Sequence, residues 1–517
     1  MEQAHPRLHA CTNSNKPALI VADAAQTISY GKLVDHADRA AQLFARLGLI
    51  QGDTIAIFLE NHVRYPELCW AAKNSGITYA CISSQASVDD AAYIVDNSDA
   101  KLLISSLALA ATAVAVAARS RTDLHCLMID GVIGSFKSYE TLLEGEAPIP
   151  LTHRRRGPSM LYSSGTTGRP KGVRRPLPDE APEMPTSRLA MLRSHYGLDA
   201  DTVLINPGPF YHAAPGRFMI SVQRLGGTVI GFGKFDAEQT LAAIEHYRAT
   251  HGVFVPTMLI RMLKLPAEVK ARYDLSSLRC AIHLAAPCPI PVKEQMIEWW
   301  GPILEEMYAG TEATGHTFIN SAEWLTHKGS VGRATEGCQI RILDEQGRDQ
   351  PPFRPGTIYM CNGQNFEYYK DPDKTRSAYA APGWATLGDI GYLDSDGYLY
   401  LTDRQAHMII SGGVNVYPQE AENALYSHPD VADVAVIGVP HPEFGEEVKA
   451  VVQPKNPVID SKQLEADIIA WCRARLSPIK CPRSVDFVTE LPRNEAGKLV
   501  KRLVKDRYWQ GHQTRIL

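Results

Sequence analysis

The sequence predicts an α/β protein in which parallel-type sheets are covered by helices, with a smaller α+β part at its C-terminal end. The chain is long enough for more than one domain, because 517 residues with 45% hydrophobic content can form several buried cores. Short apolar runs alternate with helical patterns over much of the chain, which is typical of parallel sheets covered by helices. After Thr402 this alternation changes to a different order of strands and helices.

The elements of the larger part follow from local patterns. Residues 54–59 read Thr-Ile-Ala-Ile-Phe-Leu, an apolar run of strand length that we expect to be buried. Helical patterns lie on both sides of this run, and the order of strand then helix recurs later in the chain. The predicted helices are residues 30–47, a segment through Trp70–Asn74, 238–250 and 256–265, and the further strands are 228–231 and 252–255.

One uncharged, alanine-rich segment spans Leu102–Ala118. It is shorter than the roughly 20 residues that cross a bilayer, so we expect a buried helix there and no transmembrane segment. Residues 176–185 are rich in proline and acidic residues, and they are expected to form an exposed excursion.

The part after Thr402 predicts a compact α+β unit of roughly 110 residues, an ordinary domain size. Its expected strands are residues 434–438, 447–453 and 484–488, and its expected helices are 419–427 and 461–476.

Charge and cysteine content argue against several classes of protein. The net charge is −4, from 53 basic and 57 acidic residues, so there is no global electrostatic footprint for nucleic acid. The ten cysteines show no zinc-site spacing, which favours unpaired thiols in a reduced compartment. The N-terminal residues lack the features of a secretory signal, and we expect a cytoplasmic protein. A homodimer is one assembly that the sequence allows.

Residues 162–173 read Tyr-Ser-Ser-Gly-Thr-Thr-Gly-Arg-Pro-Lys-Gly-Val and form the most informative motif. Its glycines let the backbone bring N–H groups close to an anion, its hydroxyls add donors, and Lys171 adds a positive charge. These features suit a polyphosphate, although the spacing is not that of a Walker A loop. An ordinary Ser/Thr/Gly-rich surface loop is the alternative. The motif resembles the phosphate-binding signature of the acyl-adenylate-forming superfamily, and further motifs in the superfamily's order extend the resemblance over nearly the whole chain.

The resemblance implies a large N-terminal domain over residues 1–403, including a smaller barrel-like part, and a small mobile C-terminal domain over residues 404–517. In this superfamily the small domain rotates between two half-reactions. The pivot lies two positions after Arg404 and is usually charged, whereas this chain has Ala406 there.

The Tyr-Ala-Gly-Thr-Glu motif at residues 308–312 assigns part of a nucleotide site by the same resemblance. Tyr308 would stack on adenine, Thr311 would contact the α-phosphate, and Glu312 would bind Mg²⁺. In isolation, Thr311 and Glu312 would more simply be the cap and the first turn of a helix. The small-residue loop within His-Leu-Ala-Ala-Pro, at residues 283–287, would contact adenine through its backbone.

Asp389 and Arg404 are the implied ribose ligands. A carboxylate can accept hydrogen bonds from both ribose hydroxyls, and a guanidinium adds donors to the sugar or the phosphate. The loop around Gly412 and Gly413 is the one that the resemblance places against CoA.

Two residues are implied to act on the reacting groups. Lys498, in the element Pro-Arg-Asn-Glu-Ala-Gly-Lys, would stabilise charge on the carboxylate and phosphate oxygens during adenylation. His212 would gate or orient the carboxylate, although a histidine in an apolar segment is more often simply packed. No aspartate occurs between Pro207 and Pro215, where amino-acid-activating members generally carry one, and this favours an acyl or aryl carboxylate.

Together the motifs imply one active site, whose residues would have several different roles. The catalytic residues would be Lys498, His212, Thr166 and Glu312, and the metal ligands would be Glu312 and Thr166. The ATP- and AMP-binding residues would be Ser163, Ser164, Gly165, Thr166, Thr167, Gly168, Lys171, Ala285, Ala286, Pro287, Tyr308, Thr311, Asp389, Arg404 and Lys498. Gly412 and Gly413 would bind CoA, and Ala406 would be the hinge.

The implied function is that of an AMP-forming carboxylate–CoA ligase that uses ATP, Mg²⁺ and CoA. The expected substrate is a fatty, bulky aryl or steroid-type acid. One alternative is a stand-alone adenylating enzyme that loads a carrier protein. The other is a catalytically silent nucleotide-binding protein, against which the presence of the implied functional side chains argues.

Overall fold

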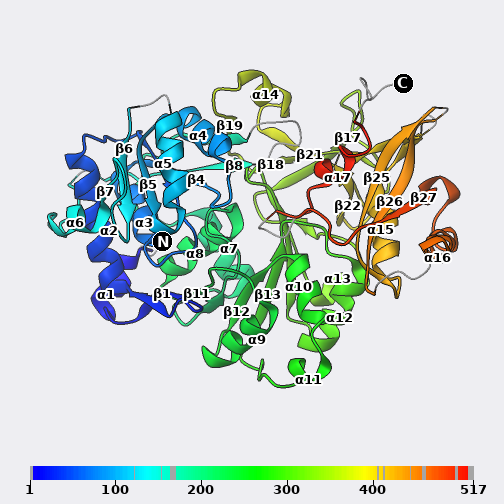
Figure 1. The fold of residues 1–517 in the computed structure, drawn as a ribbon, viewed down its shortest axis with the longest axis horizontal. Coiled ribbons are helices and arrows are strands. Elements are labelled where there is room, and N and C mark those ends of the chain that lie inside the picture. The colour runs from blue at the N-terminus through cyan, green and yellow to red at the C-terminus, as the bar shows by residue number, and fades with distance from the viewer. Residues whose placement is uncertain are drawn as a thin grey trace. The chain divides into compact units, whose positions relative to one another are not determined.

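The computed structural model describes residues 4–120, 123–152, 154–163, 170–404, 407–411, 414–442, 444–456, 461–494 and 499–510, apart from the side chains of Ser163, Asp403, Arg404 and Asn415. The chain forms two compact units (Figure 1). The first contains Met1–Phe254, Leu265–Ile282 and Asn365–Ser377, and the second contains Val255–Lys264, His283–Gln364 and Ala378–Leu517. The domain boundary expected between residues 403 and 404 stays a prediction.

The first unit contains an eight-stranded sheet in the order β19-β9-β8-β4-β3-β5-β6-β7. Its strands are β3 (Thr54–Phe58), β4 (Thr78–Ile82), β5 (Ala100–Ser106), β6 (His125–Ile129), β7 (Lys137–Ser138), β8 (Ser159–Ser163), β9 (Lys171–Arg174) and β19 (Glu367–Tyr368). The central strands β3, β4 and β5 are parallel, and β3 and β4 are buried along their whole length. Full burial is expected of parallel strands that are covered on both faces.

Helices cover this sheet and bury its apolar side chains. They are α2 (Tyr30–Arg46), α3 (Tyr65–Ser75), α4 (Val88–Asn97), α5 (Ala110–Arg119) and α6 (Tyr139–Glu144). Figure 1 shows α4 and α5 beside β4 and β5, where Val95 and Val116 pack with Phe58 in one core. α2 begins after Ser29, whose hydroxyl accepts a hydrogen bond from Lys32 N, so the helix expected over residues 30–47 is confirmed.

The helix expected over Leu102–Ala118 is wrong for its first half. β5 runs to Ser106, a 3₁₀ turn covers Leu107–Leu109, and only α5 is helical. The apolar run at the start of the segment is buried as a central strand of a parallel sheet. A short apolar run of this kind fits a buried strand as well as a buried helix, so its pattern alone does not distinguish them.

A second group of strands in the first unit follows the order β12-β10-β11-β1-β2. The strands are β1 (Pro17–Val21), β2 (Gln26–Ser29), β10 (Val203–Ile205), β11 (Thr228–Gly231) and β12 (His251–Phe254), and β13 (Cys280–Leu284) begins in this unit. The unit's other helices are α1 (Pro6–Thr12), α7 (Ser187–Tyr196), α8 (Ala213–Leu225), α9 (Ala237–His246), α11 (Ala267–Lys270) and α14 (Pro372–Ser377). α9 ends before the predicted residue 250, because the chain turns at Arg248 with a positive φ of 49°.

The second unit contains an antiparallel sheet in the order β17-β18-β21-β20, with β22 paired to β21. The elements here are α10 (Pro256–Leu263), α12 (Ile290–Trp300), β14 (Leu304–Ala309), β15 (His316–Asn320), α13 (Ser321–Thr326), β16 (Arg333–Ala334), β17 (Gln339–Leu343), β18 (Gly356–Cys361), β20 (Tyr379–Ala381), β21 (Trp384–Leu393) and β22 (Leu399–Arg404). Ile342, Ile358 and Leu399 form the core against this sheet, and Tyr308 packs at its side.

The last part of the second unit contains the sheet β24-β23-β26-β25, with β27 parallel to β26. Its elements are β23 (Ile409–Ser411), β24 (Val414–Val416), α15 (Pro418–Tyr426), β25 (Val431–His441), β26 (Gly445–Pro454), α16 (Ser461–Arg473), β27 (Ser484–Phe487) and α17 (Lys501–Lys505). Val434 and Val452 pack with Ile468 in the core, so the α+β pattern expected after Thr402 is confirmed. The mixed α/β class is confirmed as well, with a large N-terminal part and a smaller C-terminal part.

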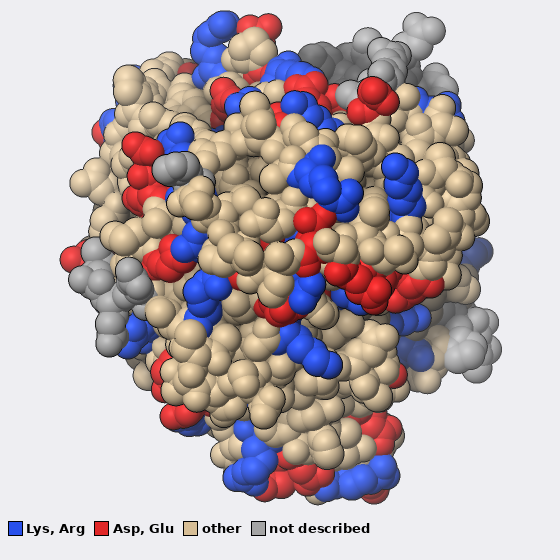
Figure 2. Space-filling model, turned by 90° about the vertical axis from the view of Figure 1, so that its left-hand side faces the viewer, with Lys and Arg blue, Asp and Glu red and all other residues tan. Residues whose placement is uncertain are grey.

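Three further features of the structure concern the charges, the cysteines and the helices. On the face shown in Figure 2, basic and acidic side chains are interspersed. None of the ten cysteines, all of which the structure describes, forms a disulfide. None of the helices in the described ranges combines the length and the apolar character needed to span a bilayer.

Candidate active site

The predicted phosphate loop connects two antiparallel strands of the first unit. β8 ends at Ser163 and β9 begins at Lys171, and these two residues are partners in the strand register. The loop residues Ser164, Gly165, Thr166, Thr167 and Gly168 lie outside the described residues, and the side chain of Ser163 is not described. Their roles therefore stay predictions, including that of Thr166 as a metal ligand.

The strand that carries Lys171 pairs with a short strand from a distant part of the sequence. β19 pairs with β9, so that Tyr368 lies opposite Val173. Lys171 Nζ lies 5.6 Å from the centre of the Tyr368 ring, within the range of a cation–π contact. The sequence motifs do not reveal this partner, because β19 has only two residues and lies far along the chain.

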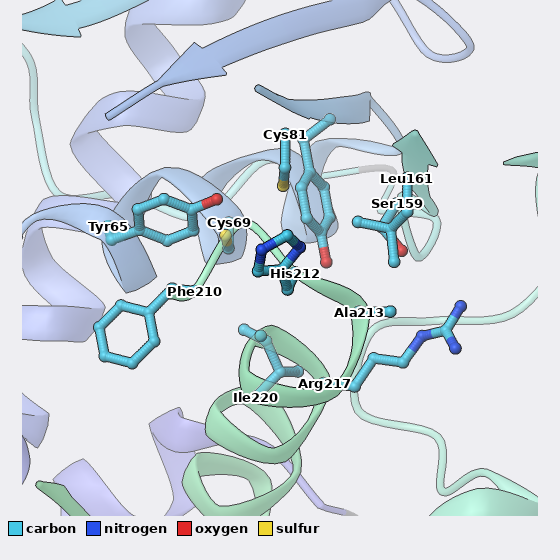
Figure 3. A pocket seen from close by; sticks show the side chains of 12 residues that line it. Tyr65, Cys69, Cys81, Ser159, Leu161, Phe210, His212, Ala213, Arg217 and Ile220 are labelled. Atoms are coloured by element: carbon cyan, nitrogen blue, oxygen red, sulfur yellow. The ribbon is translucent and has the colours of Figure 1, made fainter. Parts of the chain in front are cut away.

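His212 precedes α8 and lines a pocket of the first unit, which Figure 3 shows from close by. Its backbone is extended, with φ −80° and ψ 152°, and its ring contacts that of Tyr211 at 4.7 Å between centres. Burial lowers the pKa of His212 from 6.5 to about 4, so the imidazole is neutral near pH 7. Its Nε2 is buried and has no hydrogen-bond partner among the described residues. A neutral imidazole whose buried Nε2 has no described hydrogen-bond partner is able to orient a carboxyl group.

The pocket beside His212 is narrow, with a cavity volume of about 20 Å³. It lies between α3, β4, β8, the segment before α8, and α8 itself. Its lining consists of Tyr65, Cys69, Tyr79, Cys81, Ser159, Leu161, Phe210, His212, Ala213, Gly216, Arg217 and Ile220. Of this set, only His212 lies in a motif that predicts a site residue. The other residues come from elements whose order along the chain does not reveal that they meet.

Tyr308 and Asp389 are in direct contact in the second unit. The Tyr308 hydroxyl donates a hydrogen bond of 2.6 Å to Asp389 Oδ2. Tyr308 lies near the end of β14, and Asp389 lies on β21, where it is only 5% exposed. Two motifs that the sequence assigned to one nucleotide thus meet in the fold.

Thr311 and Glu312 lie in a turn that follows β14. The helix that these residues would start in isolation is not formed, since the described chain has turns and no helix between β14 and β15. Glu312 is 8% exposed. Gly310 lets the side chains of Leu387 and Glu312 lie close to the backbone of this turn. A Cβ at position 310 would lie 2.6 Å from Leu387 and 3.0 Å from Glu312 Oε2.

The donor set at Glu312 fits Mg²⁺ that is shared with a nucleotide. In the part of the chain that the structure describes, no three His, Cys, Asp or Glu side chains gather into a metal-binding group. Mg²⁺ is usually bound by one or two carboxylates together with substrate phosphates, rather than by a cage of protein ligands. A single buried carboxylate at Glu312 is consistent with that arrangement.

The predicted adenine loop connects β13 to α12. Ala285 has a positive φ of 73°, an uncommon conformation for a residue with a Cβ. Such backbone conformations cluster at functional sites. Ala285 and Pro287 are exposed and Ala286 is half-buried, so the loop presents backbone to its surroundings.

A buried ionic cluster lies beside these elements and was not predicted. Lys293 Nζ on α12 lies 2.7 Å from Glu306 Oε2 on β14, and His283 Nε2 lies 3.4 Å from the same oxygen. Burial raises the pKa of Glu306 and lowers that of His283. The cluster joins the start of the adenine loop to the strand that carries Tyr308. Nothing in the sequence pattern marks Lys293 or Glu306 as buried.

The remaining predicted residues come from the C-terminal part of the chain. The backbone of Arg404 pairs with Asp389 across β21 and β22, and its side chain is not described. Ala406, Gly412, Gly413 and Lys498 lie outside the described residues. Around Lys498, Arg493 bridges to Leu499 and forms an ion pair of 2.7 Å with Asp433.

Comparisons with known proteins cover nearly the whole chain. Residues 7–370 match the AMP-binding enzyme family, and residues 420–498 match the AMP-binding enzyme C-terminal domain. The chain is 30% identical to the long-chain-fatty-acid–CoA ligase FadD13 of Mycobacterium tuberculosis over 488 residues, 93% of either protein. It is also 30% identical to feruloyl-CoA synthase of an Amycolatopsis species over 484 residues, 93% of this chain and 94% of that protein.

A solved structure gives the same result for the fold. The crystal structure of ATP-bound MatB from Rhodopseudomonas palustris superimposes with a TM-score of 0.83 at 28% identity, covering 98% of this chain and 99% of that one. The chain therefore belongs to the AMP-binding enzyme family, as an AMP-forming acid–thiol ligase of the acyl-adenylate-forming superfamily.

Proposed function

We propose that this protein is a carboxylate–CoA ligase that works in two half-reactions. In the first, a carboxylate oxygen attacks the α-phosphorus of ATP, the bond to the β-phosphate breaks, and acyl-AMP and pyrophosphate form. In the second, the CoA thiol loses its proton and attacks the acyl carbon, and AMP leaves with the oxygen that joined it to the acyl group. No covalent enzyme intermediate is required, because the protein orients the reactants and stabilises charge.

The observation that carries this proposal is the hydrogen bond between Tyr308 and Asp389. A tyrosine ring that stacks on a base and a carboxylate that binds ribose must lie within one nucleoside of each other. The contact meets that requirement and fixes the direction of the carboxylate. The turn with Thr311 and Glu312 directly follows the same strand, which suits residues that contact the phosphates and their Mg²⁺.

The other residues take roles that remain proposals. Lys171 and the phosphate loop would bind the polyphosphate, and Arg404 would add donors to the ribose or the phosphate. Lys498 would stabilise the adenylation transition state. Residues 404–517 would move as a domain about Ala406, which exchanges Lys498 for the loop of Gly412 and Gly413 when CoA reacts.

For the acid, we propose a fatty, bulky aryl or steroid-type carboxylate. The absence of an aspartate between Pro207 and Pro215 supports a substrate without an ammonium group. The names of the relatives, a fatty-acid ligase and a feruloyl-CoA synthase, support the fatty and the aryl acids in this range.

The experiment is a panel of fatty, aromatic and steroid acids mixed with ATP, Mg²⁺ and the purified protein. Pyrophosphate release in each mixture reports adenylation, and AMP release on addition of CoA or of a pantetheinylated carrier protein identifies the acceptor. We expect acid-dependent pyrophosphate release and thioester formation with CoA. Thioester formation only on the carrier would favour the stand-alone adenylating enzyme, and no pyrophosphate with any acid would contradict a ligase.

A further inference from the structure

The strand that carries Lys171 is bordered by a short segment from far along the chain, residues 366–370. This segment contains β19, which pairs antiparallel with β9. Beyond β19, Tyr369 N donates a hydrogen bond of 2.8 Å to Gly172 O. Both the 366–370 segment and β9 belong to the first unit of the chain. The position of β9 therefore depends on contacts with this distant segment.

Two consecutive tyrosines of the 366–370 segment contact two cations of β9. Lys171 Nζ lies 5.6 Å from the centre of the Tyr368 ring. The guanidinium carbon of Arg174 lies 4.6 Å from the centre of the Tyr369 ring. Both distances are within the range of a cation–π attraction. Since Lys171 and Arg174 are the first and last residues of β9, the two contacts attach both ends of the strand to the segment.

The Tyr368 ring is itself held in place by its neighbours. Tyr368 is only 8% exposed, and the ring of Phe366 meets it edge to face, with 5.2 Å between the ring centres. The backbone N of Tyr368 donates a hydrogen bond of 2.9 Å to Thr375 Oγ1 on α14. A buried and closely packed ring has few other positions available to it. It therefore offers a fixed surface to the flexible side chain of Lys171.

The end of α4 holds the strands on both sides of the phosphate loop. On β8, the Tyr162 hydroxyl donates a hydrogen bond of 2.7 Å to Oδ1 of Asn97, the last residue of α4. The Tyr369 hydroxyl and Lys370 Nζ donate to the two carboxylate oxygens of Asp99, at 2.7 and 2.6 Å. Figure 1 shows α4, β8 and β19 close together. β8 directly, and β9 through the 366–370 segment, are thus attached to the same helix end.

This arrangement suits an ammonium group that must bind a polyphosphate. A lysine carries a compact charge on a flexible stem, so binding an anion restricts the side chain and costs entropy. A ring that already attracts the ammonium reduces this cost, because the side chain is partly oriented beforehand. The ring occupies one side of the ammonium, and an anion can bind on another side at the same time.

We infer that Tyr368 is a positioning residue that acts through Lys171 and strengthens the binding of the phosphates that ATP has and AMP lacks. The inference rests on the proposed function, because it assumes that Lys171 binds the polyphosphate. It adds to the nucleotide site a residue that lies outside the motifs from which that site was predicted.

The test measures how much more tightly the protein binds ATP with Mg²⁺ than AMP. Calorimetric titration in the absence of acid gives both dissociation constants, and their ratio is the phosphate preference. Tyr368→Leu removes the ring and keeps an apolar side chain. We expect its phosphate preference to fall by about 5- to 30-fold, with the Kd for AMP unchanged. A general loss of structure would weaken the binding of both nucleotides together.

Two further changes at position 368 keep the shape of the ring. Tyr368→Phe keeps the electron-rich face, so it should retain most of the phosphate preference. A phenylalanine with several ring fluorines at this position has less electron density on the same face, and its preference should fall to near that of Tyr368→Leu. This comparison holds even if Tyr368→Leu does not fold.

Tyr139→Leu is the matched control. The ring of Tyr139 lies 5.7 Å from the guanidinium carbon of Arg64, so this variant also loses a cation–π contact in the first unit. Neither Tyr139 nor Arg64 belongs to the proposed nucleotide site. We expect the phosphate preference of Tyr139→Leu to equal that of the wild type.

Lys171→Met separates the inference from the proposed function. We expect it to lower the phosphate preference at least as much as Tyr368→Leu, and the double variant should lose nothing further. If Lys171→Met lowers the preference but the Tyr368→Leu or fluorinated variant keeps the wild-type value, the inference is wrong and the proposed function stands. If Lys171→Met keeps the wild-type preference, the role proposed for Lys171 fails and the inference fails with it. A wild-type protein that binds neither nucleotide would contradict the proposed function itself.

Discussion

The Tyr308 hydroxyl donates a hydrogen bond of 2.6 Å to Asp389 Oδ2 and so joins the end of β14 to β21. The two residues belong to motifs that lie 81 positions apart in the sequence. The bond orients a buried carboxylate before any ligand arrives. A carboxylate that is already oriented would lose less entropy on binding the ribose hydroxyls, as proposed for Asp389.

The role of Asp389 can be measured by removing its carboxylate. Asp389→Ala should weaken ATP binding at least tenfold, because two hydrogen bonds to a charged group, each worth about 1.5–3 kcal/mol, would be lost. Tyr308→Phe keeps the ring and the carboxylate, so its loss should be smaller, about fivefold. Calorimetric titration with ATP gives both values, and wild-type affinity in Asp389→Ala would refute the assignment.

The buried ion pair between Lys293 and Glu306 should matter chiefly for stability. Lys293→Met leaves the Glu306 carboxylate without its partner in the interior, and we expect the free energy of unfolding to fall by about 3–5 kcal/mol. The double variant Lys293→Met/Glu306→Leu removes both charges and should recover much of that loss. Urea unfolding measures all three proteins. A loss in Lys293→Met below 1 kcal/mol would mean that the pair does not stabilise the base of the adenine loop.

Burial of His212 predicts a particular dependence of stability on pH. Its pKa is lowered from 6.5 to about 4 in the folded protein, so between these values the unfolded chain binds a proton that the folded chain does not. Stability from this group is therefore present above pH 6.5 and is lost as the pH falls toward 4. At pH 5 the loss amounts to about 2 kcal/mol.

The His212→Gln variant isolates this contribution from those of the other buried histidines. Its free energy of unfolding should fall less than that of the wild type between pH 7.5 and pH 5, by the same 2 kcal/mol. Equal losses in the two proteins would show that His212 titrates normally in the folded state.

The sequence predicted the elements that local pattern determines. β11 has the predicted bounds, and α2 ends one residue before the predicted helix. Both elements have strong local signals: β11 is an apolar run bounded by glycine, and α2 is an amphipathic helix with an N-cap. The strand β5 was missed because burial on both faces removes the alternation that identifies a strand.

Only part of the candidate site was predicted, because local sequence signals mark some of its residues and not others. Tyr308 and Asp389 lie in recognisable motifs, whereas Tyr65 and Tyr368 reach their places only through tertiary packing. Tyr65 belongs to a helix, and its position in the pocket depends on how that helix packs beside β4. Lys293 and Glu306 look like surface charges in the sequence, because their burial depends on each other.

The role proposed for Lys498 predicts different effects on the two half-reactions. Lys498→Ala should slow adenylation by a factor on the order of 10²–10³, since one oriented donor would be missing from the transition state. Supplied with pre-formed acyl-AMP, the variant should make thioester at near the wild-type rate, because the proposed domain rotation would remove Lys498 before CoA reacts. Single-turnover assays from ATP and from acyl-AMP measure the two steps. A parallel loss in both would contradict the exchange of faces.

The most direct test of the ligase chemistry is the fate of the carboxylate oxygens. An acid that carries ¹⁸O in both carboxylate positions is converted with ATP and CoA, and the products are analysed by mass spectrometry. Attack on the α-phosphorus followed by thioester formation leaves one ¹⁸O on AMP and none on pyrophosphate. Unlabelled AMP, or label in pyrophosphate or orthophosphate, would contradict a mechanism through acyl-AMP.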